Sequence, residues 1–107
     1  MDIETLKTVL DLVDGKSNEG GSPWVIGESY FIRTVTYHLT GKLEAVGDRE
    51  LVLLSAAWIA DDGRFADALK HCNFSEVEPF PADRRVIVGR GSVIDATIID
   101  VLPTAQK

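Results

Sequence analysis

The 107-residue sequence contains a single cysteine, Cys72, so no disulfide can form within the chain. This scarcity is typical of proteins of a reducing cytoplasm. Apolar runs are short as well, because charged residues interrupt them well before the ~18 residues that a membrane-spanning helix needs. The chain starts with Asp2 and Glu4, where a secretory signal would carry cationic residues. We therefore expect a cytoplasmic protein with no membrane association.

Positive charge is also scarce. Lysine and arginine number 11 against 17 aspartates and glutamates, which gives a formal net charge of −6. Such an acidic chain repels polyphosphate, so any nucleic-acid binding requires a local basic cluster. Apolar residues at 45% and charged residues at 26% are ordinary for a globular protein and exclude wholesale disorder. The length corresponds to one domain over residues 1–107.

The first part of the chain has the pattern of an amphipathic helix over residues 2–14. Its apolar stripe consists of Ile3, Leu6, Val9, Leu10 and Val13. Asp2 suits the N-cap and Gly15 the C-terminal end of this helix. Residues 15–23 are rich in glycine and serine, which predicts a linker between the helix and the rest of the domain.

After the linker the pattern changes to that of β-strands. β-branched and aromatic residues dominate residues 30–46, and no glycine or proline marks a turn before Gly41, where the absent Cβ allows a sharp bend. Gly47 and Asp48 then predict a tight hairpin turn into a strand over residues 50–57. We therefore expect one bent strand, a turn and a second strand.

The remaining chain combines a short helix with further strands. Apolar residues at i, i+3 and i+4 predict one or two helical turns within residues 64–71. Two prolines in residues 72–81 indicate a loop or an irregular edge strand. Residues 85–101 are nearly all β-branched or apolar and form a last strand that is interrupted at Arg90. The predicted class is mainly β.

The last strand has apolar residues on both of its faces. A strand of this kind is normally buried on both sides or paired along both edges. In a domain this small, pairing with a neighbouring copy would cover edges that otherwise promote aggregation. We therefore expect self-association; the alternative is a strand at the centre of a monomeric barrel.

Two separate segments carry a resemblance to a known family. In residues 39–54, an apolar strand with Gly41 is followed by a turn with Asp48 and by a second apolar strand; in residues 86–99, Arg90-Gly91-Ser92 interrupts an apolar strand. They resemble the two signature motifs of the Sm-like family, which includes the Sm and LSm proteins and the bacterial Sm-like RNA chaperone.

The resemblance implies a fold and an assembly. It implies an Sm-like or SH3-like small barrel of about five bent antiparallel strands over residues 24–103, preceded by the N-terminal helix and interrupted by an insertion at residues 55–84. It further implies that identical copies pair edge to edge into a homo-oligomeric ring of about five to seven subunits.

The resemblance also implies a ligand and a site. Family members bind RNA bases, which places an RNA- or nucleotide-binding pocket at Asp48, Arg49, Arg90, Gly91 and Ser92. The family's asparagine position falls on or near Glu50, and no aromatic side chain occupies the first turn to stack a base. These departures and the net charge favour the alternative of a structural or adaptor ring that binds protein partners and no nucleic acid.

Arg90 has two interpretations. Its planar guanidinium, between two glycines, suits phosphate or carboxylate and would repeat around the central hole of a ring. Alternatively, it forms a structural salt bridge with Asp48 or Asp95 of a neighbouring copy. Three aromatic residues are assigned to the core or an interface rather than to base stacking: Trp24, Tyr37 and Trp58.

The sequence contains no convincing catalytic or metal constellation. His71 and Cys72 are adjacent, so their side chains would diverge by ~100° on a helix, and no oxyanion loop accompanies them. The carboxylates Asp61, Asp62, Glu76 and Glu78 lack the spacing of a known metal loop and are interpreted as surface acids. We expect a noncatalytic protein with no metal and no cofactor.

A second resemblance concerns origin. Residues 31–41 and 57–65 look like segments of small uncharacterised bacteriophage-encoded proteins. This implies a phage origin and a place in the cytoplasm of an infected or host bacterium, and it supplies no mechanism.

Overall fold

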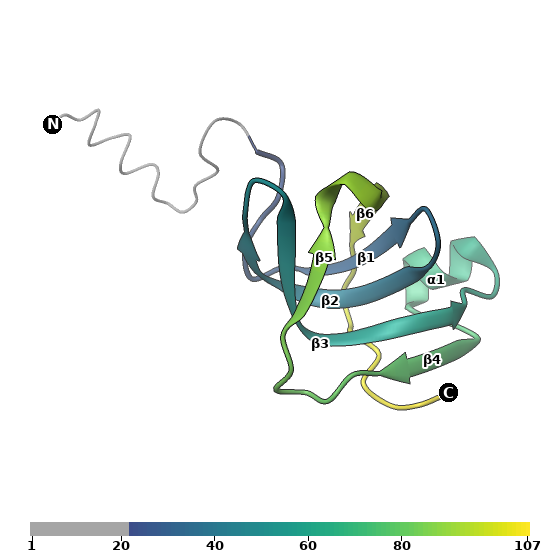
Figure 1. Ribbon diagram of the computed structural model, residues 1–107. Coiled ribbons are helices and arrows are strands. Elements are labelled where there is room, and N and C mark those ends of the chain that lie inside the picture. Colours follow the sequence, from purple (N-terminus) through teal and green to yellow (C-terminus); the bar gives the residue numbers. More distant parts are fainter. Residues whose placement is uncertain (1–21) are drawn as a thin grey trace, which may run out of the picture.

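The computed structural model describes residues 22–107, whose strands form one antiparallel sheet (Figure 1). The elements are β1 (Ser29–Thr34), β2 (His38–Val46), β3 (Glu50–Asp61), α1 (Phe65–His71), β4 (Glu76–Pro79), β5 (Val86–Gly89), the 3-10 turn Arg90–Ser92 and β6 (Val93–Ile98). The predicted mainly β class is confirmed. The helix predicted over residues 2–14 lies outside the described residues, and the helix that the structure does describe, α1, is internal.

The sheet has the order β4-β3-β2-β1-β6, and β5 pairs with β3 beside β4. Within the described residues β5 and β6 do not pair with each other, so the sheet is not closed and the predicted closed barrel is wrong. The reason is the 3-10 turn between them: it leaves β5 on β3 and sends β6 across to β1. The two ends of the sheet are therefore joined by the chain and not by a hydrogen-bond ladder.

A sharp bend in β2 and β3 lets the sheet curl. Ser55 has a positive φ of 52°, and the register between β2 and β3 shifts between Thr40 and Lys42. Gly41 lies in this shift, and a Cβ there would come within 2.8 Å of Leu53 Cβ. A bulge increases the local bend and twist of a strand pair. The prediction that the chain bends at Gly41 is confirmed.

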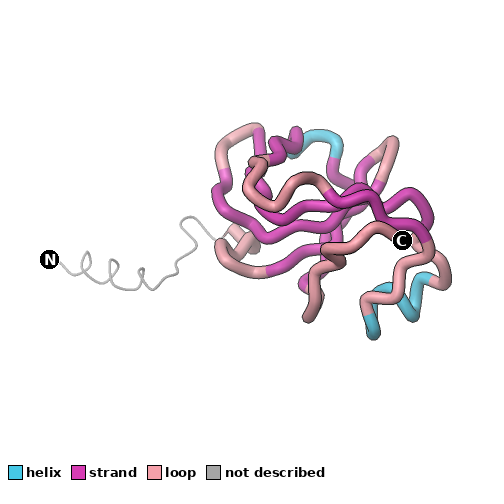
Figure 2. Tube along the Cα trace, turned by 90° about the horizontal axis from the view of Figure 1, so that it is seen from below, coloured by secondary structure: helices cyan, strands magenta, loops and turns pink. Residues whose placement is uncertain are grey.

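Two hydrophobic cores lie on opposite faces of the sheet. Successive residues of a strand point to opposite faces, and in β1 Tyr30 and Ile32 enter one core while Phe31 enters the other. The second core is completed by Ala68 of α1 together with Phe74 and Val77. Within residues 55–84, Ala68 of α1 and Phe74 therefore cover the second face of the sheet. Figure 2 shows α1 and the 3-10 turn on well-separated sides of the strands.

The chain between residues 30 and 46 forms a hairpin, and the expectation of one continuous strand is wrong. Its turn contains neither glycine nor proline. The Thr34 hydroxyl supplies what those residues usually provide: it donates to the carbonyl oxygen of Tyr37 at 2.5 Å and accepts the Tyr37 N–H at 3.1 Å. A threonine that bonds to nearby backbone groups can stabilise a turn in this way.

The last strand, β6, lies at an edge of the sheet, where β1 is its single neighbour among residues 22–107. The alternative that placed the last strand at the centre of a monomeric barrel is therefore wrong. β1, which lies between β2 and β6, has buried residues on both of its faces. Such a continuous run of buried residues is more usual in parallel sheets that are covered on both sides.

Candidate functional site

The two turns that the sequence analysis placed in one site lie next to each other. One turn, at residues 47–49, joins β2 to β3, and the 3-10 turn Arg90–Ser92 joins β5 to β6. The backbone N–H of Arg90 donates to the carbonyl oxygen of Arg49 at 2.8 Å. Its guanidinium Nη1 donates to the carbonyl oxygen of Gly47 at 2.6 Å. The contact arises because β5 pairs with the start of β3.

Arg90 holds these two turns together. Its side chain is half-buried, and its bond to the Gly47 carbonyl is charge-assisted. Within the chain it forms no salt bridge with Asp48 or Asp95, since the Asp95 carboxylate is bound by Arg33. Arg90 is thus a positioning residue for the turn pair.

The outer surface of the turn pair is polar and of mixed charge. Asp48, Arg49 and Gly91 are exposed, whereas the Ser92 hydroxyl donates to the carbonyl oxygen of Gly89 at 2.8 Å. Arg49 lies in sequence between two acids, and neither turn contains an aromatic residue. Neighbouring carboxylates weaken the attraction of a phosphate to one exposed arginine. This surface can bind an anion through Arg49, without a ring on which to stack a base.

Within residues 22–107, the outer edge of β6 carries backbone groups that pair with no other strand. The N–H of Ile99 donates to the carbonyl oxygen of Ser29 at 2.8 Å, and hydrogen-bonded pairs alternate along an antiparallel ladder. The register of β6 on β1 therefore directs the N–H and C=O groups of Thr97 toward β1 and those of Ala96 and Ile98 away from the sheet. These outward groups are available to another strand.

The outer edge of β5 has the same character. Arg90 donates its N–H to Arg49, so by the same alternation the backbone groups of Ile87 and Gly89 face away from β3. Exposed apolar side chains accompany both edges: Ile87 is 68% exposed, Ile94 64% and Ile98 49%. Two unpaired edges with exposed isoleucines can each accept a strand of another chain.

One ion pair joins β6 to β1 next to the first residue of α1. Arg33 Nε donates to Asp95 Oδ1 at 2.8 Å from the directly opposite position on β1, and the Arg33 guanidinium lies 4.8 Å from the centre of the Phe65 ring. The hydrogen bonds from Arg33 lower the pKa of Asp95, and those to Asp95 raise the pKa of Arg33.

The other candidate groups are dispersed. His71 ends α1 and is exposed, and Cys72 follows in a left-handed conformation with a φ of 55°. His38 Nδ1 lies 2.9 Å from Asp62 Oδ2, and Asp61 Oδ1 accepts the N–H of Gly63 at 2.9 Å. In residues 22–107, no group of three or more histidines, cysteines and acids is arranged to hold a metal ion.

Two aromatic side chains that the sequence analysis assigned to the core or an interface are half-exposed. Tyr37 is 47% exposed and Trp58 46%. Both line a hollow of about 450 Å³ that also contains His38 and Asp62, and both line an adjoining apolar hollow of about 280 Å³. Their positions follow from the turn after β1 and from the bulge in β3, neither of which the sequence pattern predicted.

Comparison with known proteins found no matching family model, no similar curated protein and no similar solved structure. Among the described residues, no helix is long and apolar enough to cross a bilayer.

Proposed function

We propose that the protein is a noncatalytic structural or adaptor subunit that assembles head to tail with copies of itself through the outer edges of β5 and β6. The observation that carries the proposal is that, in the part of the chain that the structure describes, both outer edges are unpaired and Ile87, Ile94 and Ile98 are exposed beside them. Pairing β5 of one copy with β6 of the next would satisfy the outward backbone groups and cover these side chains.

Such pairing would produce either a ring or a filament. The β5 and β6 edges are different surfaces of one chain, so their association is heterologous and generates a closed ring or an open filament. The Sm-like resemblance of residues 39–54 and 86–99 favours closure into a ring of about five to seven copies. A phage origin and a bacterial cytoplasmic location belong to the same proposal.

Native mass spectrometry at low micromolar concentration tests the assembly. We expect the unmodified chain to give a mass of about five to seven copies, and the double variant Ile94→Lys with Ile98→Lys to give a monomer, since lysines on an edge oppose strand addition. Ile26→Lys is the matched control, because Ile26 is 63% exposed and lies before β1. A monomeric unmodified chain, or a double variant that assembles normally, would contradict the proposal.

RNA or nucleotide binding at Asp48, Arg49, Arg90, Gly91 and Ser92 is a second candidate function. The adjacency of the two turns supports it. If phosphate contacts matter, the affinity for a uridine- or adenine-rich oligonucleotide should fall steeply as salt rises, and Arg49→Ala should weaken it more than Arg84→Ala. Absence of binding at low salt would reject this candidate and leave the structural or adaptor function.

A further inference from the structure

Tyr37 and Trp58 separate two adjoining hollows on one surface of the protein. Tyr37 precedes β2, and Trp58 lies on β3 directly opposite Leu39. On one side of the two rings is the hollow with Asp61 and Asp62, and on the other is the hollow with Phe80. We call the two hollows together the aromatic groove. A chain segment lying across Tyr37 and Trp58 would contact both hollows.

The apolar half of the groove has a floor suited to an apolar side chain. Leu39, directly opposite Trp58 on the neighbouring strand, is fully buried and lines this hollow together with Val86. Phe80 forms its rim and is 39% exposed. Half-exposed aromatic rings gathered around an apolar floor mark a contact surface more often than an ordinary solvated one. This half of the groove has space for an apolar residue.

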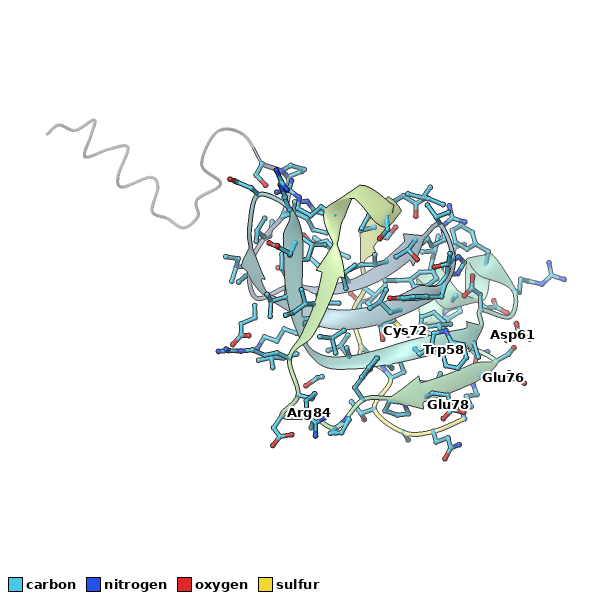
Figure 3. The ribbon with its side chains drawn as sticks, in the orientation of Figure 1. Trp58, Asp61, Cys72, Glu76, Glu78 and Arg84 are labelled. Carbon is cyan, nitrogen blue, oxygen red and sulfur yellow. The ribbon has the colours of Figure 1, made fainter. Side chains whose placement is uncertain are left out.

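Carboxylates lie in and next to the other half of the groove, whose hollow is lined by Asp61 and Asp62. Glu78 of β4 lies directly opposite Trp58, and Asp61 lies opposite Glu76 at the end of the same strand pair. Figure 3 shows Trp58, Asp61, Glu76 and Glu78 gathered where β3 runs beside β4, with Arg84 well apart from them. In residues 22–107 the ion pairs involve Arg33, His38 and Arg85, so none neutralises Asp61, Glu76 or Glu78.

Aromatic rings next to carboxylates suit a ligand with a cationic side chain. A cation gains from the face of an indole or phenol ring and from nearby carboxylates, and the aliphatic stem of lysine or arginine can lie against the same rings. A nucleic acid could stack a base on Trp58, but its phosphates would meet the negative charge of the groove. Charge complementarity therefore favours a basic peptide over RNA at this surface.

We propose that the aromatic groove binds an extended segment of a partner protein in which a lysine or arginine is next to an apolar residue. The basic side chain lies over Trp58 and Tyr37 toward Asp61 and Glu78. The apolar residue enters the hollow between Phe80 and Leu39. The groove includes Val86 of β5 but none of Ile87, Ile94 and Ile98, so the proposal does not rest on self-assembly.

A peptide titration followed by NMR tests the proposal. The probe is acetyl-Pro-Arg-Val-Pro-Arg-Val-amide, and its partner peptide has glutamate in place of each arginine. The chain contains two tryptophans, so the indole N–H signal of Trp58 reports on the groove while that of Trp24 serves as an internal control. We expect the arginine peptide to shift the Trp58 signal saturably and the glutamate peptide to leave it unchanged.

Charge variants then separate groove binding from attraction to an acidic protein in general. Glu78→Lys should weaken peptide binding about tenfold, since it replaces an attraction by a repulsion near the cation. Asp61→Asn should weaken it less while keeping an acceptor for the Gly63 N–H. Glu28→Lys makes the same charge change as Glu78→Lys at an exposed position before β1 and should leave the affinity unchanged.

Several outcomes would overturn the proposal. One is a Trp58 signal that does not move at millimolar peptide, and another is equal weakening by Glu78→Lys and Glu28→Lys. Displacement of the Trp58 signal by oligouridine with no response to the peptide would assign the groove to RNA. A Trp58 shift that follows protein dilution alone would assign it to a second copy of this chain.

Discussion

β4 and β6 are both edge strands of one sheet, but their outer sides differ in charge and in what covers them. β4 is short, carries two exposed glutamates and ends at Pro79. Lys107 also covers it: the Lys107 N–H donates to the Val77 carbonyl at 3.0 Å, and the Val77 N–H donates back at 3.1 Å. Charge, proline, short length and a covering segment are the devices by which proteins protect an edge.

β6 has none of these protections on its outer side. Its single charged residue, Asp95, is paired with Arg33, and Ile94 and Ile98 are exposed. Within residues 22–107 no segment pairs with its outer edge. Among residues 22–107, one edge is thus well protected and the other is apolar and not paired on its outer side. This difference motivates the proposal that the β6 edge receives a strand of another copy.

Proline substitutions at neighbouring positions of β6 should show the largest effect. Thr97→Pro removes an N–H that faces β1, so we expect the free energy of unfolding to fall by on the order of 3 kcal/mol. Ala96→Pro removes an N–H that faces outward and should abolish assembly at a much smaller cost in stability. Urea unfolding and native mass spectrometry measure the two effects. Equal destabilisation by both variants would show that the inferred alternation is wrong.

Uncovering β4 should have an intermediate effect. Lys107→Pro removes the backbone N–H that bonds to Val77, and we expect a loss of about 1 kcal/mol in unfolding free energy. Lys107→Ala is the control, because it keeps both backbone bonds and loses only the contact of Nζ with Asn73. Urea unfolding gives the free energy of unfolding, and hydrogen exchange of the Val77 amide shows whether this N–H remains bonded at the β4 edge. If the two variants have the same stability and the same exchange rate, the pairing of Lys107 with β4 does not contribute to stability.

Protonation of Asp95 should have the smallest effect, because both partners of its ion pair are substantially exposed. Arg33 lowers the pKa of Asp95 below its usual 3.8 in the folded state, so the unfolded chain binds the proton more readily. The pair therefore stabilises the fold above about pH 3.8, and this contribution is lost as pH falls through the folded-state pKa.

Thermal unfolding between pH 2 and 6 measures this contribution, with those limits chosen to bracket the ordinary range of a carboxyl group (about 4). Asp95→Asn should lower the melting temperature slightly near neutral pH and flatten its decline in acid. Asp83→Asn, a change at an exposed residue of the loop before β5, should do neither. If the melting temperature of Asp95→Asn falls in acid as steeply as that of the unmodified chain, the ion pair does not contribute to stability.

Local patterns in the sequence predicted a large part of the fold. The turn after β2, the bend at Gly41, the helix α1 and the break at the 3-10 turn each depend on a few neighbouring residues. The turn after β1 was missed because a threonine hydroxyl replaces the usual glycine or proline signal. That Asp48, Arg49, Arg90, Gly91 and Ser92 lie on adjacent turns was expected from the family resemblance.

The groove and the edges could not be read from the sequence in the same way. Whether Trp58 is buried or exposed depends on the face of β3 to which its side chain points. The bulge at Ser55 adds one residue to β3, so Trp58 points to the face opposite to the one that strict alternation would give. A shift of one residue in register moves every later side chain to the other face of a sheet. The partner of Arg90 likewise depends on the pairing of β5 with β3, not on any local pattern.

The sequence by itself determined the mainly β class, most turns and the short helix, because these follow from the conformational preferences of nearby residues. Tertiary structure alone decided which strands are edges, which aromatic rings remain exposed and which carboxylates have no ion-pair partner among residues 22–107. Those features depend on contacts between residues far apart in the chain, such as β1 with β6 and β3 with β5. The residue type alone does not show whether an apolar side chain is buried in a core or exposed at the edge of a sheet.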